Sequence, residues 1–166
     1  MTTGPAADDD LHEVRLIDVP VGLHARSQER AAELIREMYL IEQARHHDVG
    51  ADQPEHALPG RLIELIDALT GQYGGFTVQQ DREMLDAISR GLASIELVYR
   101  VPRAAGDAAL RLMEMLDEVD KYCLQGRHLL TLATPPELVR YRHWYLREFA
   151  GQLAGSEPTP WPEFGD

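Results

Sequence analysis

The histidines are the residues of this chain most suited to chemistry, but their spacing matches no recognised catalytic or metal motif. There are seven of them: His12, His24, His46, His47, His56, His128 and His143. A zinc protease needs two histidines four residues apart on one helix with a glutamate between them, and a di-iron bundle needs two Glu-x-x-His pairs. Neither pattern occurs. The group at His46, His47 and His56 leaves two interpretations open: a metal-binding loop, or a solvated helix end where imidazolium favours the helix dipole.

Candidate nucleophiles and phosphate-binding loops are equally weak. The single cysteine, Cys123, falls on the apolar face of an expected helix, where burial keeps a thiol protonated and unreactive. No serine lies in a nucleophile elbow. The glycine-rich stretch at 71–76 lacks the Gly-Lys-Ser/Thr that a phosphate loop requires. We therefore assign no catalytic residue, no metal ligand and no cofactor, and we expect no enzymatic activity.

Composition excludes several classes of partner. The 166 residues carry 16 Lys and Arg against 28 Asp and Glu, which gives a formal charge of −12. A nucleic acid or an anionic membrane surface attracts a basic footprint, so we expect neither as a partner. No apolar run approaches the ~18 residues that a membrane-spanning helix needs, and the N-terminus lacks the pattern of a secretory signal. These features predict a soluble, cytoplasmic protein.

The composition along the chain predicts one helical domain between two tails. Residues 1–12 are small and acidic, and residues 155–166 are rich in proline and acids. Neither stretch can bury enough apolar surface to offset its own ordering entropy. We therefore expect a disordered acidic N-terminal tail, a single domain over 13–154 and a Pro-rich C-terminal tail.

Hydrophobic periodicity predicts a mainly α fold, a five-helix bundle with a short two-stranded β ribbon. Thr77 and Thr134, each three residues before a Gln or a Glu, are typical of capping boxes and begin the third and fifth helices. Gly126 follows the fourth helix, where a C-terminal glycine is common. The expected helices span approximately 21–46, 59–69, 77–101, 103–124 and 135–153.

Three segments are candidates for strands. The stretches 13–20 and 129–133 are short and apolar, and pairing them is the simplest way to form the ribbon. The segment 95–101 is ambiguous. Its apolar residues alternate as in a strand, but they also continue the helical stripe that begins at Met84, and we favour the helix.

Arg142 is the unusual residue of the last expected helix. On a wheel of ~100° per residue it lies near the centre of the apolar face, close to Leu146 and Phe149. A buried guanidinium requires a carboxylate partner. We therefore predict a buried ion pair at Arg142, and we keep contact with a bound ligand as the alternative.

The opposite side of the same helix carries a candidate partner-binding surface. The wheel places Trp144 away from the apolar face, with Arg140 and Arg147 beside it. Tryptophan and arginine dominate binding hot spots because both supply a large contact area. With Trp161 of the C-terminal stretch, these residues form a basic, aromatic set that suits an acidic partner. The alternatives are stacking of Arg140 on Trp144 and internal cover of Trp144 by Trp161 and Phe164.

Four stretches of the chain resemble an uncharacterised family of short, acidic actinobacterial proteins. They are VRLxxVPVxLHAR from Val14, YxVP from Tyr99, LLTLATPPE from Leu129 and RxWYLxEF from Arg142, and the resemblance spans roughly 13–161. These motifs encode no reaction. The resemblance implies genes near partner-switching components, namely anti-sigma kinases, anti-anti-sigma proteins of the STAS type and their serine phosphatases, and so an accessory regulatory role.

Together these observations favour a non-catalytic protein-interaction regulator. We expect an accessory component of a partner-switching system, with anti-sigma or STAS-type proteins as its partners. The alternative is a sensor bundle that binds a small ligand or a metal between its helices, as bundle cores do. The sequence leaves the oligomeric state open.

Overall fold

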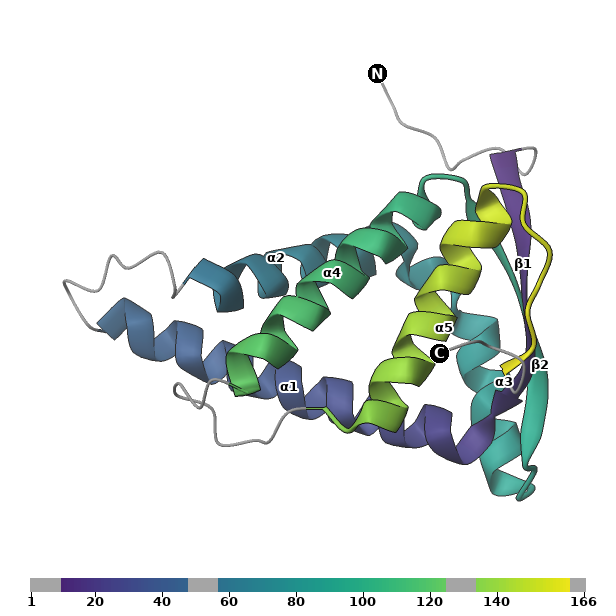
Figure 1. Cartoon of the computed structure of the whole chain (residues 1–166), viewed down its shortest axis with the longest axis horizontal. Coiled ribbons are helices and arrows are strands. Elements are labelled where there is room, and N and C mark those ends of the chain that lie inside the picture. The colour runs from purple at the N-terminus through teal and green to yellow at the C-terminus, as the bar shows by residue number, and fades with distance from the viewer. Residues whose placement is uncertain (1–9, 48–56, 125–133, 162–166) are drawn as a thin grey trace.

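The fold is mainly helical with one pair of strands, as the sequence predicts (Figure 1). A computed structural model describes residues 10–47, 57–124 and 134–161. Within those ranges lie five α-helices, one 3₁₀ turn and two strands. The elements run in the order β1 (Leu11–Pro20), α1 (Val21–His47), α2 (Ala57–Tyr73), η3 (Gly74–Phe76), α3 (Val78–Ser89), β2 (Ser94–Pro102), α4 (Ala105–Leu124) and α5 (Pro136–Leu153).

The two strands pair antiparallel, and one face of the pair belongs to the core. Val14 of β1 lies opposite Tyr99 of β2, and both side chains are buried. The next pair, Arg15 and Val98, is exposed because successive side chains of a strand point to opposite faces. The ribbon therefore has an apolar inner face and a polar outer face.

The second strand corrects two expectations. Residues 95–101, which the sequence analysis favours as helix, belong to β2. The helix before them ends at Ser89 because Gly91 adopts a positive φ of 66°, a conformation that closes a helix and is natural for glycine. The second concerns the partner of β1, which among the described residues is β2. Residues 129–133 lie outside the described residues.

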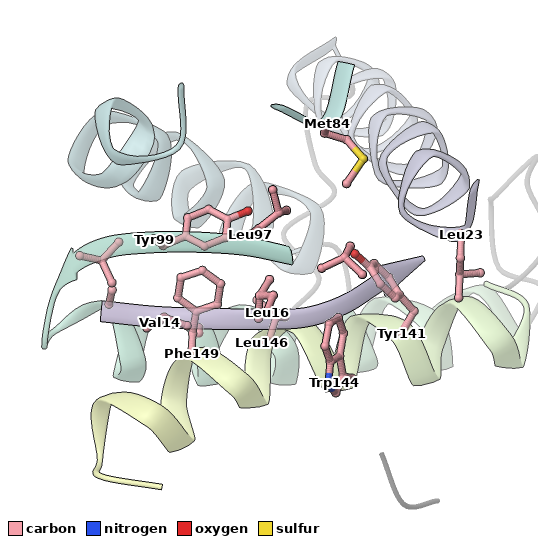
Figure 2. Close-up of a cluster of buried hydrophobic side chains, with 14 of the residues drawn as sticks. Val14, Leu16, Leu23, Met84, Leu97, Tyr99, Tyr141, Trp144, Leu146 and Phe149 are labelled. Carbon is pink, nitrogen blue, oxygen red and sulfur yellow. The ribbon is translucent and has the colours of Figure 1, made fainter. Parts of the chain in front are cut away.

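The main core lies between the inner face of the sheet and α5. Figure 2 shows α5 running along the two strands, with aromatic and aliphatic side chains filling the space between them. Met84 of α3 and Leu23 of α1 close one end of this cluster. The buried residues from the sheet and α5 are Val14, Leu16, Val19, Leu97, Tyr99, Val101, Leu138, Tyr141, Trp144, Leu146, Phe149 and Leu153.

A second, smaller core joins α1, α2 and α4 at the other end of the molecule. Leu34 and Met38 of α1 pack with Leu62 of α2 and Val119 of α4, and all four are buried. Figure 1 shows these three helices extending away from the sheet. The molecule thus consists of a sheet-and-helix end, where α5 lies, and a three-helix end.

The expected capping boxes are wrong, although the helices begin close to the expected residues. The hydroxyl of Thr77 donates to the carbonyl of Gly74 and makes no cap bond to α3. The hydroxyl of Thr134 donates to the carboxylate of Asp120, and Pro135 stands at the N-cap of α5 without a side-chain bond. In both cases a tertiary or turn contact replaces the local cap.

The boundaries of the expected domain also change. Strand β1 begins at Leu11, two residues before the expected domain start at 13. At the other end, residues 155–161 do not stand apart from the domain, because Trp161 packs against the main core. The described parts of both expected tails therefore belong to the fold.

Candidate functional site

Helix α5 is buried on two sides, and this explains the wrong placement of Trp144. Leu146 and Phe149 pack toward the sheet, as the wheel predicts. Trp144, which the wheel places on the outside, has 0% of its surface exposed. Part of its cover comes from the residues that follow α5. A wheel with one apolar face cannot represent a helix that contacts the sheet on one side and its own chain on the other.

A sharp reversal at the end of α5 brings those residues back over the helix. The N–H of Ser156 donates to the carbonyl of Gly151 at 2.8 Å, and the N–H of Gly155 donates to that of Gln152 at 3.0 Å. This pair of bonds is the Schellman motif, and the φ of 102° at Gly155 suits a residue without a side chain. The following residues, 156–161, are called the C-terminal segment. Figure 1 shows them running back beside the sheet.

The centre of the C-terminal segment is held through the backbone of Thr159. The indole Nε1–H of Trp144 donates to the Thr159 carbonyl at 2.7 Å. The Thr159 N–H donates to the carboxylate of Glu148 at 3.0 Å. Trp144 and Glu148 are both buried and one helical turn apart, so the segment supplies hydrogen-bond partners that their polar atoms need. Pro158 and Pro160, on either side of Thr159, have restricted φ and no N–H of their own.

The end of the C-terminal segment is held by aromatic packing. The ring of Trp161 meets Tyr141 edge-on at a centroid distance of 5.5 Å and Trp144 at 5.6 Å. The guanidinium carbon of Arg140 lies 4.8 Å from the centre of the Trp161 ring, in cation–π contact. We call the side of α5 that makes these contacts the α5 contact face, and it consists of Arg140, Tyr141, Trp144 and Glu148.

The structure thus brings together three of the four residues named as partner-binding. Arg140, Trp144 and Trp161 form one contact, while Arg147 is exposed. The arrangement at Trp161 is the internal cover, one of the two alternatives that the sequence analysis left open. Phe164, the other residue proposed for that cover, lies outside the described residues.

Gln152 connects the α5 contact face to the edge of β1. Its amide nitrogen donates to the Glu148 carboxylate and to the Arg15 carbonyl, each at 2.8 Å. Its amide oxygen accepts the Arg15 N–H at 2.8 Å. A continuous chain of hydrogen bonds therefore runs from the β1 backbone through Gln152 and Glu148 to Thr159. The spacing of Glu148 and Gln152, four residues apart on a helix, was the only sequence signal for it.

Arg142 takes part in an ion pair with α4. Its guanidinium donates to Asp117 at 2.6 Å and to Asp120 at 2.7 Å, and only 12% of its side chain is exposed. Asp120 also accepts the hydroxyl of Thr134 at 2.7 Å, and Arg30 of α1 donates to that hydroxyl at 3.3 Å. This network joins α1, α4 and the start of α5. It matches the ion pair, rather than the ligand contact, among the two arrangements that the sequence left open.

His143 shares the Asp117 carboxylate with Arg142. The Nε2 atom of His143 lies 2.8 Å from Asp117 Oδ1. Partial burial works to raise the pKa of the Asp117 carboxyl, but the hydrogen bonds from His143 and Arg142 outweigh it and hold that pKa below its ordinary value. Asp117 is therefore an ionised structural partner for two cationic or polar side chains.

A buried histidine and three tyrosines form a second polar group, which the sequence analysis missed. The Nδ1 atom of His24 lies 2.6 Å from the Tyr141 hydroxyl, and the hydroxyls of Tyr99 and Tyr145 lie 2.9 Å apart. Burial lowers the pKa of His24, an effect that the charge of Asp81 partly opposes. Burial also raises the pKa of the Tyr145 hydroxyl to about 12. All four groups are therefore neutral at pH 7.

The other candidates named from the sequence receive no test from the described side chains. The backbones of His46, His47 and Cys123 belong to helices, but their side chains lie outside the described set, as does all of His56. Among the described residues, no three His, Cys, Asp or Glu side chains are arranged to hold a metal ion. No described helix is long and apolar enough to cross a membrane.

One surface cavity lies apart from the α5 contact face. It has a volume of about 570 Å³ and sits between the start of α4 and the end of α5. Its polar lining includes His12, Arg103 and Asp107. Arg142 does not line it, so this cavity gives no support to a ligand contact for that residue.

Comparison with known proteins assigns no family. No protein-family model, no curated protein and no solved structure matches this chain.

Proposed function

We propose that this chain is a non-catalytic protein-interaction regulator that acts through the α5 contact face. The proposal depends on how α5 holds the C-terminal segment. The Trp144 indole N–H donates to the carbonyl of Thr159, and the Thr159 N–H donates to the carboxylate of Glu148. The ring of Trp161 packs on the ring of Trp144. Aromatic-lined binding domains hold extended, proline-containing peptides with the same kinds of contact. The segment is therefore bound to α5 in the manner of a peptide ligand.

The way the segment is attached supports its exchange for a partner. It follows the turn at Gly155 and contacts one side of α5, whereas Leu146 and Phe149 lie in the core with the strands, and in this proposal its release leaves that packing in place. Release uncovers the rings of Tyr141 and Trp144 beside the Arg140 guanidinium. Aromatic rings with an adjacent arginine are the composition of binding hot spots. In this proposal the segment covers the face in the resting chain, and a partner takes its place.

The resemblance to the actinobacterial family supports a biological setting. The resemblance implies that the gene for this chain lies beside genes for partner-switching regulators. The proposed role is therefore an accessory component of such a system in the cytoplasm. Anti-sigma or STAS-type proteins are then the partners to test first. The formal charge of −12 supports a protein partner over a nucleic acid or an anionic membrane.

Affinity purification of the tagged full-length chain from its native cell tests this proposal. Three chains are compared: the wild type, Trp161→Ala and Glu157→Gln. Trp161→Ala removes the ring that packs on the α5 contact face, and we expect it to recover more of a stoichiometric protein partner. Glu157 is an exposed residue of the same segment, so Glu157→Gln should recover the wild-type amount.

Two results would contradict the proposal. One is the absence of a stoichiometric partner from all three purifications. The other is a partner recovered in equal amounts from the wild type and from a folded Trp161→Ala chain, because that partner binds elsewhere on the protein. Circular dichroism of each purified chain verifies folding.

A further inference from the structure

We infer that the α5 contact face binds an extended Pro-X-Pro-aromatic segment of a partner protein, and that residues 158–161 of this chain occupy the site as an internal copy of that ligand. The inference rests on the proposed function and names the chemistry of the partner. In this chain the four positions are Pro158, Thr159, Pro160 and Trp161.

The α5 contact face recognises the central position X through hydrogen bonds to its backbone. The indole N–H of Trp144 donates to the carbonyl of Thr159 at 2.7 Å. The N–H of Thr159 donates to the carboxylate of Glu148 at 3.0 Å. X therefore cannot be proline, because proline lacks the N–H that Glu148 needs. Both bonds use main-chain atoms, so the side chain at X is open to variation.

The flanking prolines favour the extended shape that this geometry requires. Each fixes its own φ near −65°, and Pro160 also biases X away from the helical region. A segment that is already extended loses less conformational entropy on binding than a flexible one. A partner with a proline on each side of X therefore binds more tightly than one without them.

The aromatic position fills the space between two rings and one cation. Trp161 meets Tyr141 and Trp144 at 5.5 and 5.6 Å, and Arg140 lies 4.8 Å from its centre. The ligand class is therefore a Pro-X-Pro-aromatic segment.

The attached segment conceals this binding in the wild-type chain. A ligand joined to its site by a short connection has an effective concentration on the order of millimolar. A free peptide must compete with it and so binds weakly. Weakening the internal copy should reveal the affinity of the face for a peptide added in solution.

The test is fluorescence anisotropy with a labelled synthetic peptide of residues 155–166. It is titrated with the full-length wild type, with Trp161→Ala and with Thr159→Pro. The last substitution removes the N–H that donates a hydrogen bond to Glu148. Both variants should bind the peptide about tenfold more tightly than the wild type, or better. Glu157→Gln, the matched control within the segment, should bind it as weakly as the wild type.

A second peptide examines the aromatic position. It carries alanine in place of the tryptophan and should bind the Trp161→Ala chain at least about tenfold more weakly than the first peptide. The inference is overturned if two folded variants fail to bind the first peptide, or if the two peptides bind equally. A wild-type dimer that Trp161→Ala dissociates would also overturn it, because the occupant would then be a second copy of this chain.

These outcomes separate the inference from the proposed function. A partner whose recovery depends on Trp161, together with no peptide binding, overturns the ligand chemistry alone. Peptide binding by both variants, together with no partner from the native cell, supports the ligand chemistry and contradicts the regulatory role.

Discussion

The side chain of Gln152 pairs with both backbone groups of Arg15, as a neighbouring strand would. Its amide oxygen accepts the Arg15 N–H and its amide nitrogen donates to the Arg15 carbonyl. At the opposite edge of the ribbon, the amide nitrogen of Gln80 donates to the carbonyl of Val98, the residue of β2 that lies opposite Arg15. Glutamine side chains thus close both edges of the ribbon in this row, which protects exposed strand edges from pairing with another chain.

Gln152→Glu should destabilise the protein by about 1–3 kcal/mol. A carboxylate cannot donate to the Arg15 carbonyl, and it places a second negative charge beside Glu148. Gln79→Glu is a matched control, because Gln79 also lies four residues from a glutamate but is exposed. Its cost should be below about 0.5 kcal/mol. Urea unfolding of the two variants measures the difference, and equal costs would show that the Gln152 contacts add no stability.

Arg142→Ala should cost about 3–5 kcal/mol in the free energy of unfolding. The substitution leaves Asp117 and Asp120 without their cation, and Asp120 is buried. Arg147→Ala, an exposed arginine on the same helix, should stay within about 0.5 kcal/mol of the wild type. Urea unfolding at pH 7 makes the comparison. A loss below about 1 kcal/mol for Arg142→Ala would mean that the ion pair contributes no more than a surface pair.

Asp117→Asn should make stability less dependent on pH in the acid range. The pKa of Asp117 is lower in the folded chain than the value of about 3.9 expected when unfolded. The ionised carboxylate therefore contributes stability above pH 4, and that contribution disappears as pH falls toward the folded pKa. The stability difference between wild type and Asp117→Asn should narrow between pH 5 and pH 2.5. Urea midpoints across that range test it, and a constant difference would refute the Asp117 assignment.

His24→Gln should reduce the loss of stability between pH 7 and pH 5. Burial lowers the pKa of His24 in the folded chain, whereas the unfolded chain takes up a proton near pH 6.5. The unfolded state therefore binds more protons below that pH, and the wild type loses stability as pH falls toward the folded pKa. Glutamine carries no such charge. Thermal melts at several pH values compare the two chains, and parallel profiles would contradict the role of His24.

The sequence predicts the five helices and the first strand, because these elements follow from local spacing. Strand 13–20 and the five helices come from periodicity that the structure retains. The helix prediction for 95–101 was wrong because the helical and strand patterns of this segment compete locally. The pairing with β1, which decides between them, is a long-range contact. Gly91, whose positive φ ends α3, is the local signal that the helix stops before this segment.

The contact of the C-terminal segment with α5 was harder to predict. The wheel correctly separated Arg142 from Trp144 but could not show that Trp144 has its own cover, since that cover depends on the reversal at Gly155. A tryptophan and a glutamate one turn apart on the outer side of a helix look like a surface pair. Only the returning chain, with the Thr159 N–H and carbonyl between them, turns that pair into a binding site.

Gly155→Ala should loosen the C-terminal segment while α5 stays folded. The φ of 102° at this position strains any residue with a side chain by about 1–3 kcal/mol. The chain can relieve that strain by giving up the reversal, which separates Trp161 from Trp144. Both tryptophans of the protein lie in this contact, so acrylamide should quench the fluorescence more strongly in the variant. Gly75→Ala is the control, because a Cβ there meets open space, and it should keep the wild-type quenching. Equal quenching in a folded Gly155→Ala chain would show that the reversal does not hold the segment on α5.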